Sequence, residues 1–240
     1  MRLAVLSDIH SNGPALEAAL EAVGAFDQLW VLGDIVGYGP HPDEVVERLR
    51  DLDVVAVQGN HDAAALGRIP TGTFNDLARA AVKWTAETMK PVNLDWLAEL
   101  PDKRVEGDYT LAHGSPRDPT WEYLFSIPAA RVNLAAFETP YCIVGHTHHQ
   151  LTFRDDKGQV EALLAEDGSR LTLDERRCIL NPGSVGQPRD GDPRACAMTI
   201  DTESAVVRWL RIEYDIERTQ EAIRALPLPR RLADRLEMGV

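Results

Sequence analysis

Three of the seven histidines in this chain, His146, His148 and His149, fall within four consecutive positions behind Gly145. A single histidine there could be a packing residue, but three imidazoles in one short stretch raise the question of a metal site. Four further stretches carry carboxylate, amide or imidazole groups that can bind metal ions. These stretches are Asp8-Ile9-His10, Gly33-Asp34, Gly59-Asn60-His61-Asp62 and His113-Gly114.

Each of the five stretches follows an apolar run that is typical of a β-strand. In open α/β sheets, sites form beyond the carboxyl ends of the strands, where the loops converge. Residues two apart on an extended segment project to the same side, so Asp8 with His10, and His146 with His148, could each reach one ion. We therefore expect the five stretches to meet at one edge of the fold.

The side chains that we expect to bind metal comprise two aspartates, one asparagine and four histidines. They are Asp8, His10, Asp34, Asn60, His113, His146 and His148. This mixed oxygen and nitrogen set suits Mn, Fe, Zn, Ni or Co better than Ca or Mg. Seven ligands are too many for one tetrahedral ion, but they fit two divalent ions that share a bridging carboxylate. In such sites the ions lie roughly 3.5–4 Å apart and clamp the attacking and leaving oxygens of a displacement.

The first half of the chain alternates between strand and helix patterns. Apolar runs predict strands at 3–8, 28–34 and 54–62. Helical spacing predicts helices at 14–26, 42–52, 75–89, 92–100 and 129–138. Strands that alternate with helices favour a parallel sheet with crossover helices. A hairpin is expected over 104–114, with its turn at Gly107-Asp108, and an aromatic, proline-rich loop over 115–125.

After residue 148 the pattern changes to strands separated by turns. The expected strands are 150–156, 159–165, 178–186, 195–201 and 205–215. They suggest a second, largely antiparallel sheet, followed by a helix over 216–226 and an Arg-rich tail. We expect an α/β fold with two packed mixed β-sheets flanked by helices, forming a single domain over 1–240.

The motifs D-x-H, G-D, G-N-H-D, H-G and G-H-x-H occur in this order between residues 8 and 148. Their order resembles the signature of calcineurin-like metallophosphoesterases, which implies an α/β-β/α sandwich. The resemblance implies that one metal is held by Asp8, His10, Asp34 and His148. It implies that Asp34 bridges to a second metal, which Asn60, His113 and His146 complete. A hydroxide that bridges the two ions would then be the nucleophile.

The same resemblance implies that His61 is not a ligand but lies beside the scissile phosphate. There it would donate a proton to the leaving oxygen or stabilise the charge that develops on it. The protein Ser/Thr phosphatase branch continues its second motif as G-D-x-V-D-R-G. In this chain Gly37 replaces the Asp that orients the catalytic histidine, and Tyr38 replaces the Arg that binds phosphate. This disfavours a phosphoprotein phosphatase and leaves His61 without an evident orienting partner.

The flanking sequences S-D-I-H-S-N, G-D-I-V-G-Y-G-P-H-P and H-G-S-P-R-D-P look more like the small bacterial phosphodiesterase-like branch. Three more residues are candidates for substrate binding. Asn12 stands at an expected helix start, where it could cap the helix or contact phosphate. Arg117 and Arg189 lie in Pro/Gly loops, where surface exposure is the default, but arginine is the usual bidentate phosphate partner.

Four residues near the motifs have simple structural interpretations. His41 is expected to face solvent, and His149 to lie behind the ligands or at the surface. Trp121 and Tyr123 could stack on a base, but packing is the simpler interpretation. The three cysteines are spaced without a C-x-x-C pair, so we expect small buried side chains in a reducing compartment.

The composition narrows the class of partner. The 240 residues carry a formal charge of −13, which argues against stable nucleic-acid binding because that requires a basic patch. An anionic ester could still bind where two dications offset the aspartates. No apolar run approaches the roughly 20 residues of a membrane span, and the N-terminal run is too short for a signal-peptide core. We therefore expect a cytoplasmic protein without a membrane segment.

These patterns favour a metal-dependent hydrolase of phosphate esters, with small phosphodiesters or nucleotides as the first choice of substrate. A phosphomonoesterase, or a non-catalytic metal-binding scaffold of the same fold, is the alternative. The sequence leaves the native metal and the oligomeric state open, and an oligomer is compatible with it.

Overall fold

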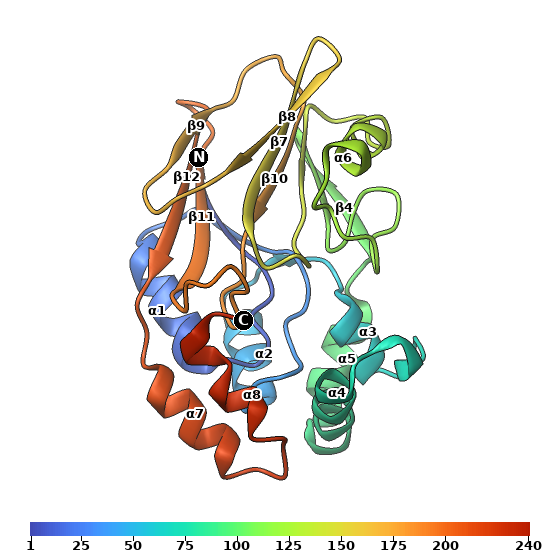
Figure 1. Cartoon of the computed structure of the whole chain (residues 1–240), viewed down its shortest axis with the longest axis vertical. Coiled ribbons are helices and arrows are strands. Elements are labelled where there is room, and N and C mark those ends of the chain that lie inside the picture. The colour runs from blue at the N-terminus through green and yellow to red at the C-terminus, as the bar shows by residue number, and fades with distance from the viewer.

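Two six-stranded sheets pack face to face with helices outside them, as the computed structural model of residues 1–240 shows (Figure 1). The first sheet has the strand order β3-β2-β1-β11-β12-β9. The second has the order β4-β5-β6-β10-β7-β8. Both sheets contain parallel and antiparallel pairs, so the expected fold class is confirmed.

The first sheet is built around three parallel strands from the start of the chain. These are β1 (Arg2–Leu6), β2 (Gln28–Val31) and β3 (Val55–Ala56). On the other side of β1 the sheet continues with β11 (Ala195–Asp201), β12 (Val206–Ile212) and β9 (Arg170–Thr172), all in antiparallel pairs. Helices α1 (Gly13–Val23), α2 (Pro42–Asp51) and α7 (Ile216–Arg224) lie in the lower half of the view in Figure 1.

The second sheet also has a parallel centre. It contains β5 (Tyr109–Ala112), β6 (Tyr141–Ile143) and β10 (Cys178–Pro182). Antiparallel strands flank them: β4 (Lys103–Glu106), β7 (Gln150–Asp156) and β8 (Gln159–Leu164). Helix α6 (Ile127–Leu134) packs against β7, β8 and β10.

Three short or medium helices connect the two sheets along the chain. They are α3 (Asn60–Ala65), α4 (Asp76–Thr88) and α5 (Pro91–Glu99). A short α8 (Arg231–Asp234) and 3₁₀ turns at Thr71–Thr73 and Leu236–Met238 complete the helical elements. None of the helices has the length and apolar character that a bilayer crossing would require.

The strands of the second half do not form a sheet of their own, so that expectation is wrong. Strands β11 and β12 extend the first sheet, whereas β10 lies between β6 and β7 in the second. Apolar periodicity predicts that a segment is a strand, but the pairing partner depends on which strand edge is still free. The open edge of β1 is covered by β11, which aligns Leu3 with Ile200 and Val5 with Met198.

The apolar runs are continuous because both faces of the central strands are buried. In β1, Leu3 and Val5 point into the core between the sheets, where Trp30 and Trp209 also pack. Ala4 and Leu6 point to the opposite face, where the helices cover the first sheet. The three cysteines are buried and unpaired, as expected.

The expected strand over 54–62 is only two residues long, and a helix replaces its second half. Helix α3 begins at Asn60, and the Asp62 carboxylate accepts a hydrogen bond from the Gly59 backbone N–H at 2.9 Å. A carboxylate in the first turn stabilises a helix start by satisfying a free N–H donor. The G-N-H-D motif therefore places Asn60 and His61 on the first turn of a helix.

Candidate metal centre

The five stretches singled out in the sequence meet at the ends of parallel strands from both sheets. Strand β1 ends shortly before Asp8, β2 before Asp34, β5 directly before His113, and β6 before His146. Helix α3 begins with Asn60 just after β3. All seven side chains expected to bind metal are buried, with at most 3 % of each residue exposed.

The backbone at this site is not extended, so the alternation argument from the sequence is wrong even though the residues do meet. Five of the seven residues have a positive φ, between 48° and 64°. They are Asp8, His10, Asp34, His146 and His148. Left-handed backbone costs about 1–3 kcal/mol at a non-glycine residue and persists only where the surrounding structure imposes it. Here the chain turns sharply after each strand, and these turns aim the side chains inward.

Asp8, His10 and His148 form the first cluster, in which one potential ligand atom from each lies within 4.8 Å of the others. The Nδ1–H of His10 donates to the Val36 carbonyl at 3.1 Å, and that of His148 donates to the Gln187 carbonyl. A carbonyl can only accept, so each neutral ring keeps its lone pair on Nε2. The two Nε2 atoms nevertheless face each other at 3.3 Å.

Asp34, His113 and His146 form the second cluster, and Asn60 adjoins it. The Nδ1–H of His113 donates to the Leu32 carbonyl at 2.8 Å, which again leaves the Nε2 lone pair free. That Nε2 lies 3.0 Å from Asn60 Oδ1, 3.0 Å from His146 Nδ1 and 3.4 Å from Asp34 Oδ2. Four possible ligand atoms therefore converge on one point.

Each of the two aspartates has one oxygen held by donors and one directed into the site. Asp8 Oδ2 accepts from the Ser7 hydroxyl at 2.6 Å and from the His146 N–H at 3.0 Å. Its Oδ1 has no hydrogen-bond partner and lies 3.2 Å from His148 Nε2. Asp34 Oδ1 accepts from the His61 N–H at 2.8 Å.

The free oxygen of Asp34 links the two clusters. Its Oδ2 lies 3.6 Å from His10 Nε2 on one side and 3.4 Å from His113 Nε2 on the other. A carboxylate oxygen in this position can bind two cations at once. Asp34 is thus the residue whose geometry matches a bridging ligand.

Buried acceptors that face one another repel unless a proton or a cation lies between them. The pKa of His113 also indicates that positive charge is favoured here. Burial alone would lower this pKa, but the Asp34 carboxylate raises it to about 9. The pKa of Asp34 is held well below its usual range because His113 and His61 outweigh the effect of burial. This donor set combines oxygen atoms with imidazole nitrogens, and carbonyls fix the tautomers of three of the four imidazoles. It therefore fits divalent metal ions.

His61 forms a third group of possible ligand atoms within 4.8 Å of one another, with His10 and Asp34, and its ring lies among aromatic rings. Its ring centroid is 4.4 Å from that of Tyr38, 4.8 Å from that of His10 and 5.0 Å from that of Phe74. Its Nδ1 has no hydrogen-bond partner, and a Cβ atom on Gly37 would stand 2.4 Å from it. Packing against rings, together with the space at Gly37, orients His61 where the sequence suggested no partner.

Two residues that hold the site in place, Asp62 and Ser7, were not predicted from the sequence, because the expected ligands stand next to them in the same motifs. Asp62 is fully buried and accepts from the Val36 and Gly59 N–H groups, so it ties the second motif to the third. Burial and the nearby Asp34 carboxylate raise the pKa of Asp62 to about 7. The Ser7 hydroxyl orients Asp8 in a comparable way. A polar residue within a motif that no ligand role accounts for is the signal that could have identified both.

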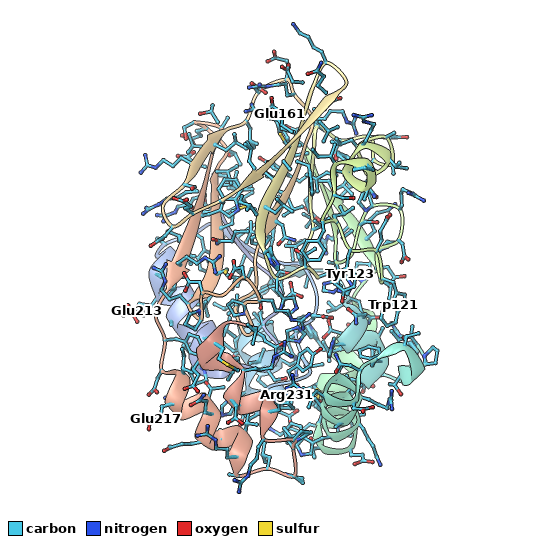
Figure 2. All side chains as sticks on the ribbon, viewed as in Figure 1. Trp121, Tyr123, Glu161, Glu213, Glu217 and Arg231 are labelled. Carbon is cyan, nitrogen blue, oxygen red and sulfur yellow. The ribbon has the colours of Figure 1, made fainter.

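Aromatic residues from the loop after β5 form a rim on the second cluster. The ring of Tyr123 stacks on that of His146, with centroids 3.8 Å apart, and Phe125 lies parallel to Tyr123. Tyr123 is 47 % exposed and Phe125 52 % exposed, so both offer open faces or edges to solvent. Trp121 packs edge-on against Phe74, and Figure 2 shows it close below Tyr123 on the same side of the molecule.

The candidate substrate residues have different surroundings. Asn12 caps α1, accepting from the Ala15 N–H at 3.3 Å and from the Thr219 hydroxyl at 3.0 Å, and it donates to the Gly186 carbonyl. Of the two roles that the sequence allowed for Asn12, capping a helix and contacting phosphate, these contacts correspond to the capping role. Arg117 forms an exposed ion pair with Glu122 at 3.6 Å. Arg189 is half-buried and donates to the Gln187 side-chain oxygen at 2.9 Å.

Two histidines outside the ligand set also have defined positions. His41 was expected to face solvent, but it is half-buried at the start of α2. Its Nδ1 has no hydrogen-bond partner. His149 is half-buried, and its Nδ1 contacts the Thr147 carbonyl at 2.7 Å.

Comparison with known proteins agrees with this architecture. A family model described as the calcineurin-like phosphoesterase superfamily domain matches residues 1–205. The crystal structure of a metallophosphoesterase from Sphaerobacter thermophilus superimposes with a TM-score of 0.93 at 45 % identity, covering 100 % of this chain and 99 % of that one.

Two relatives extend the comparison at the level of sequence. An uncharacterized protein of Methanocaldococcus jannaschii is 36 % identical over 244 residues, covering 99 % of this chain and 98 % of its own length. The phosphodiesterase YfcE of Escherichia coli K12 is 26 % identical over 210 residues, covering 82 % and 86 % respectively. With both sheets, the ordered motifs and a family match over most of its length, this chain belongs to the calcineurin-like phosphoesterase superfamily and is a phosphoric ester hydrolase.

Proposed function

We propose that this protein is a phosphodiesterase that uses a dinuclear metal centre to hydrolyse small phosphodiesters or nucleotides. The observation that carries the proposal is the pair of acceptor clusters joined by Asp34 Oδ2, with His61 beside them. Asp8, His10 and His148 would hold one divalent ion, and Asn60, His113 and His146 the other, with Asp34 shared. Mn, Fe, Zn, Ni and Co all suit this ligand set.

Two bound cations would supply the charge that activates a water molecule and stabilises the negative charge on the phosphoryl oxygens. The protein's own contribution is to fix the ligands before substrate arrives. The carbonyls of Val36, Leu32 and Gln187 set the tautomers of three imidazoles. The Ser7 hydroxyl and the backbone N–H of His61 hold the two carboxylates. Such preorganisation avoids reorganisation during the reaction.

His61 would act on the leaving oxygen of the ester. Burial lowers its pKa to about 4, although the Asp34 carboxylate opposes this effect, so the free site holds a neutral imidazole at neutral pH. A neutral imidazole can still donate one N–H to a developing oxyanion. A bound phosphate anion would in addition favour the protonated ring, and the group could then pass a proton to the leaving oxygen.

The surface of the chain favours a small substrate over a long nucleic acid. The formal charge is −13, which opposes the binding of an extended polyanion. The rim of Tyr123 and Phe125 beside His146 offers aromatic surface, on which a nucleobase could stack. A small ester with a planar organic group therefore matches both the charge and the rim.

The decisive experiment removes the metal and then restores it. Metal-stripped protein is assayed with bis-p-nitrophenyl phosphate and p-nitrophenyl phosphate before and after Mn²⁺ is added, and bound metal is counted in parallel. We expect Mn²⁺ to restore activity mainly on the diester. The Asp34→Asn variant should remain inactive, whereas Asp95→Asn, the same change on an exposed residue of α5, should behave like the parent protein.

Other outcomes would contradict parts of the proposal. Activity mainly on the monoester would indicate a phosphatase. No activity on either ester with two ions bound, and none on nucleotides or dinucleoside polyphosphates, would indicate a non-catalytic scaffold. Cleavage of single-stranded DNA at rates similar to those for nucleotides would contradict the preference for small substrates.

A further inference from the structure

Among the four histidines of the proposed metal centre, His146 is the one whose ring no backbone carbonyl fixes. The rings of His10, His113 and His148 each donate Nδ1–H to a carbonyl, which leaves Nε2 free to bind metal. In His146 the arrangement is reversed. Its Nδ1 belongs to the second cluster and lies 3.0 Å from the Nε2 atom of His113. Its Nε2 is buried and has no hydrogen-bond partner.

A missing partner at this nitrogen matters for a metal ligand. An imidazole that binds a metal through one nitrogen carries a proton on the other, and that N–H usually donates to a carbonyl, a carboxylate or water. The hydrogen bond sets the orientation of the ring. In His146 the backbone is held, because its N–H donates to Asp8 Oδ2 at 3.0 Å, but this bond does not orient the imidazole. Another contact must therefore do so.

The ring of Tyr123 lies on the face of this imidazole. The two ring centroids are 3.8 Å apart, and the ring planes differ by 24°. His113 meets the same imidazole edge-on, with centroids 4.8 Å apart, so rings contact His146 from two directions. Such contacts restrict rotation of the imidazole. Metal binding makes an imidazole more positive, and the face of a phenol ring attracts positive charge, so the stack should strengthen when metal is bound.

The loop that carries Tyr123 begins at one ligand of the second cluster and returns to another. It leaves β5 through His113 and Gly114, and it brings Tyr123 onto His146. The Gly114 N–H donates to the Pro119 carbonyl at 2.7 Å, which closes the start of the loop on itself. A Cβ atom on Gly114 would stand 2.8 Å from a carbonyl oxygen of the same loop, so the turn is tightly packed. The path of the loop is thus tied to the cluster.

The residues on either side of Tyr123 hold its backbone in place. The Glu122 carboxylate accepts from the Ser115 hydroxyl at 2.6 Å and from the Asn133 side-chain amide at 3.0 Å. On the other side, Leu124 is only 1 % exposed and packs into the apolar cluster beneath α6. The Tyr123 ring therefore has a defined position although 47 % of the residue is exposed.

We propose that Tyr123 is a positioning residue for the second metal ion, because its stacking orients His146 in place of the hydrogen bond that this imidazole lacks. The inference rests on the proposed function, since it assumes the dinuclear centre, and it deepens that function by assigning what holds the ligand. The role concerns the metal, so it applies whichever ester is cleaved. Stacking requires the ring and not the hydroxyl group, and a phenylalanine should therefore replace Tyr123.

The test measures metal binding, so that its result does not depend on catalysis. Metal-stripped parent protein, Tyr123→Leu, Tyr123→Phe and Phe125→Leu are titrated with Co²⁺. Calorimetry gives the affinity of each site, and the visible absorption of Co²⁺ reports the coordination geometry. The variant His146→Ala identifies the signals of the second site, because His146 belongs to that cluster only. Phe125 is the matched control, since its half-exposed ring lies in the same loop and contacts Tyr123 and His149 but no ligand.

We expect Tyr123→Leu to weaken Co²⁺ binding at the second site about 10–100-fold, as loss of a group that orients a metal ligand does, and to change its absorption. The first site should keep the affinity and absorption of the parent protein. Tyr123→Phe should restore the second site, and Phe125→Leu should match the parent protein. Without metal, the Tm values of Tyr123→Leu and Phe125→Leu should be equal, and only Tyr123→Leu should gain less Tm when Co²⁺ is added.

Several results would overturn the role of Tyr123. One is a second site in Tyr123→Leu with the affinity and absorption of the parent protein. Equal weakening of both sites, or equal losses in Tyr123→Leu and Phe125→Leu, would indicate a general disturbance of the loop and would overturn it too. If Tyr123→Phe lost as much affinity as Tyr123→Leu, the hydroxyl group and not the stack would be responsible.

The same proteins separate this role from the proposed activity. If two ions bind and neither bis-p-nitrophenyl phosphate nor nucleotides are cleaved, while Tyr123→Leu still weakens the second site, the role stands and the activity fails. If the diester is cleaved and Tyr123→Leu binds both ions like the parent protein, the activity stands and the role fails. A parent protein that binds a single ion would overturn the dinuclear centre and the role of Tyr123 together.

Discussion

Gly37 and His61 lie in direct contact: a Cβ atom on Gly37 would stand 2.4 Å from Nδ1 of His61. The absence of a side chain at residue 37 therefore allows the imidazole to occupy its place beside the metal clusters. Because Gly37 also has a φ of 92°, an alanine there would meet two separate problems, backbone strain and a clash.

We predict that Gly37→Ala displaces His61 and abolishes most of the esterase activity, while bound metal stays at the parent level. Gly158→Ala is a matched control, because Gly158 has a φ of 87° but no atom within 4 Å of the added Cβ. Both variants should lose about 1–2 kcal/mol of stability from left-handed backbone. Metal analysis, thermal unfolding and assay of the two variants would check this. Equal activity in both would show that the contact does not position His61.

His61→Ala should affect esters according to their leaving group. If His61 serves the leaving oxygen, its loss should lower kcat by about 10²–10⁴-fold for esters of poorly acidic alcohols. The loss should be much smaller for p-nitrophenyl esters, whose leaving group needs little protonation. Comparing kcat for a nucleotide diester and for bis-p-nitrophenyl phosphate would measure the difference. A uniform loss on both esters would assign His61 a binding role instead.

The shared oxygen of Asp34 predicts a difference in metal content between two variants. His148 belongs to one cluster only, so His148→Ala should lose one of two ions, whereas Asp34→Asn should weaken both sites. Elemental analysis after dialysis at equal free Mn²⁺ would give the two ratios. Loss of a single ion from Asp34→Asn would contradict a bridging role.

Removal of the metal should destabilise the fold, because buried acceptors then face one another without a cation between them. A ligand present at 100 times its Kd stabilises the folded state by about 2.7 kcal/mol. We expect the Tm to fall on chelation and to recover with Mn²⁺. The fall should be larger in the parent protein than in Asp34→Asn, which has less metal to lose. A Tm that does not change with metal would contradict occupancy of the clusters.

The buried cysteines predict a dependence of the folding stability on pH that does not involve the metal site. Burial raises the pKa of Cys178 to about 11 and that of Cys196 to about 12, from an ordinary 9.0. These thiols stay neutral in the folded state, so their contribution to stability is complete below pH 9 and is lost as pH rises through 11 to 12. At pH 8, Ellman's reagent should detect no thiol before unfolding and three afterwards. Rapid labelling of native protein would contradict this burial.

Much of the site could be predicted because metal chemistry restricts residue types severely. The ordered motifs from Asp8 to His148 identified the family and the side chains that the fold brings together. Strand ends were also predictable, since each motif follows an apolar run. The motifs could single out Ser7 and Asp62 as polar residues without a ligand role, but not the groups that they contact, because a hydroxyl or carboxylate in a motif does not reveal its partner.

By itself, the sequence determined the ligand chemistry, the family and the succession of strands and helices. It did so because these depend on residue type and local periodicity. Only the tertiary structure decided that β11 and β12 complete the first sheet, that left-handed turns aim Asp8 and His10, and that Tyr123 stacks on His146. Each of these depends on contacts between residues that are distant in the chain, and local patterns do not encode such contacts.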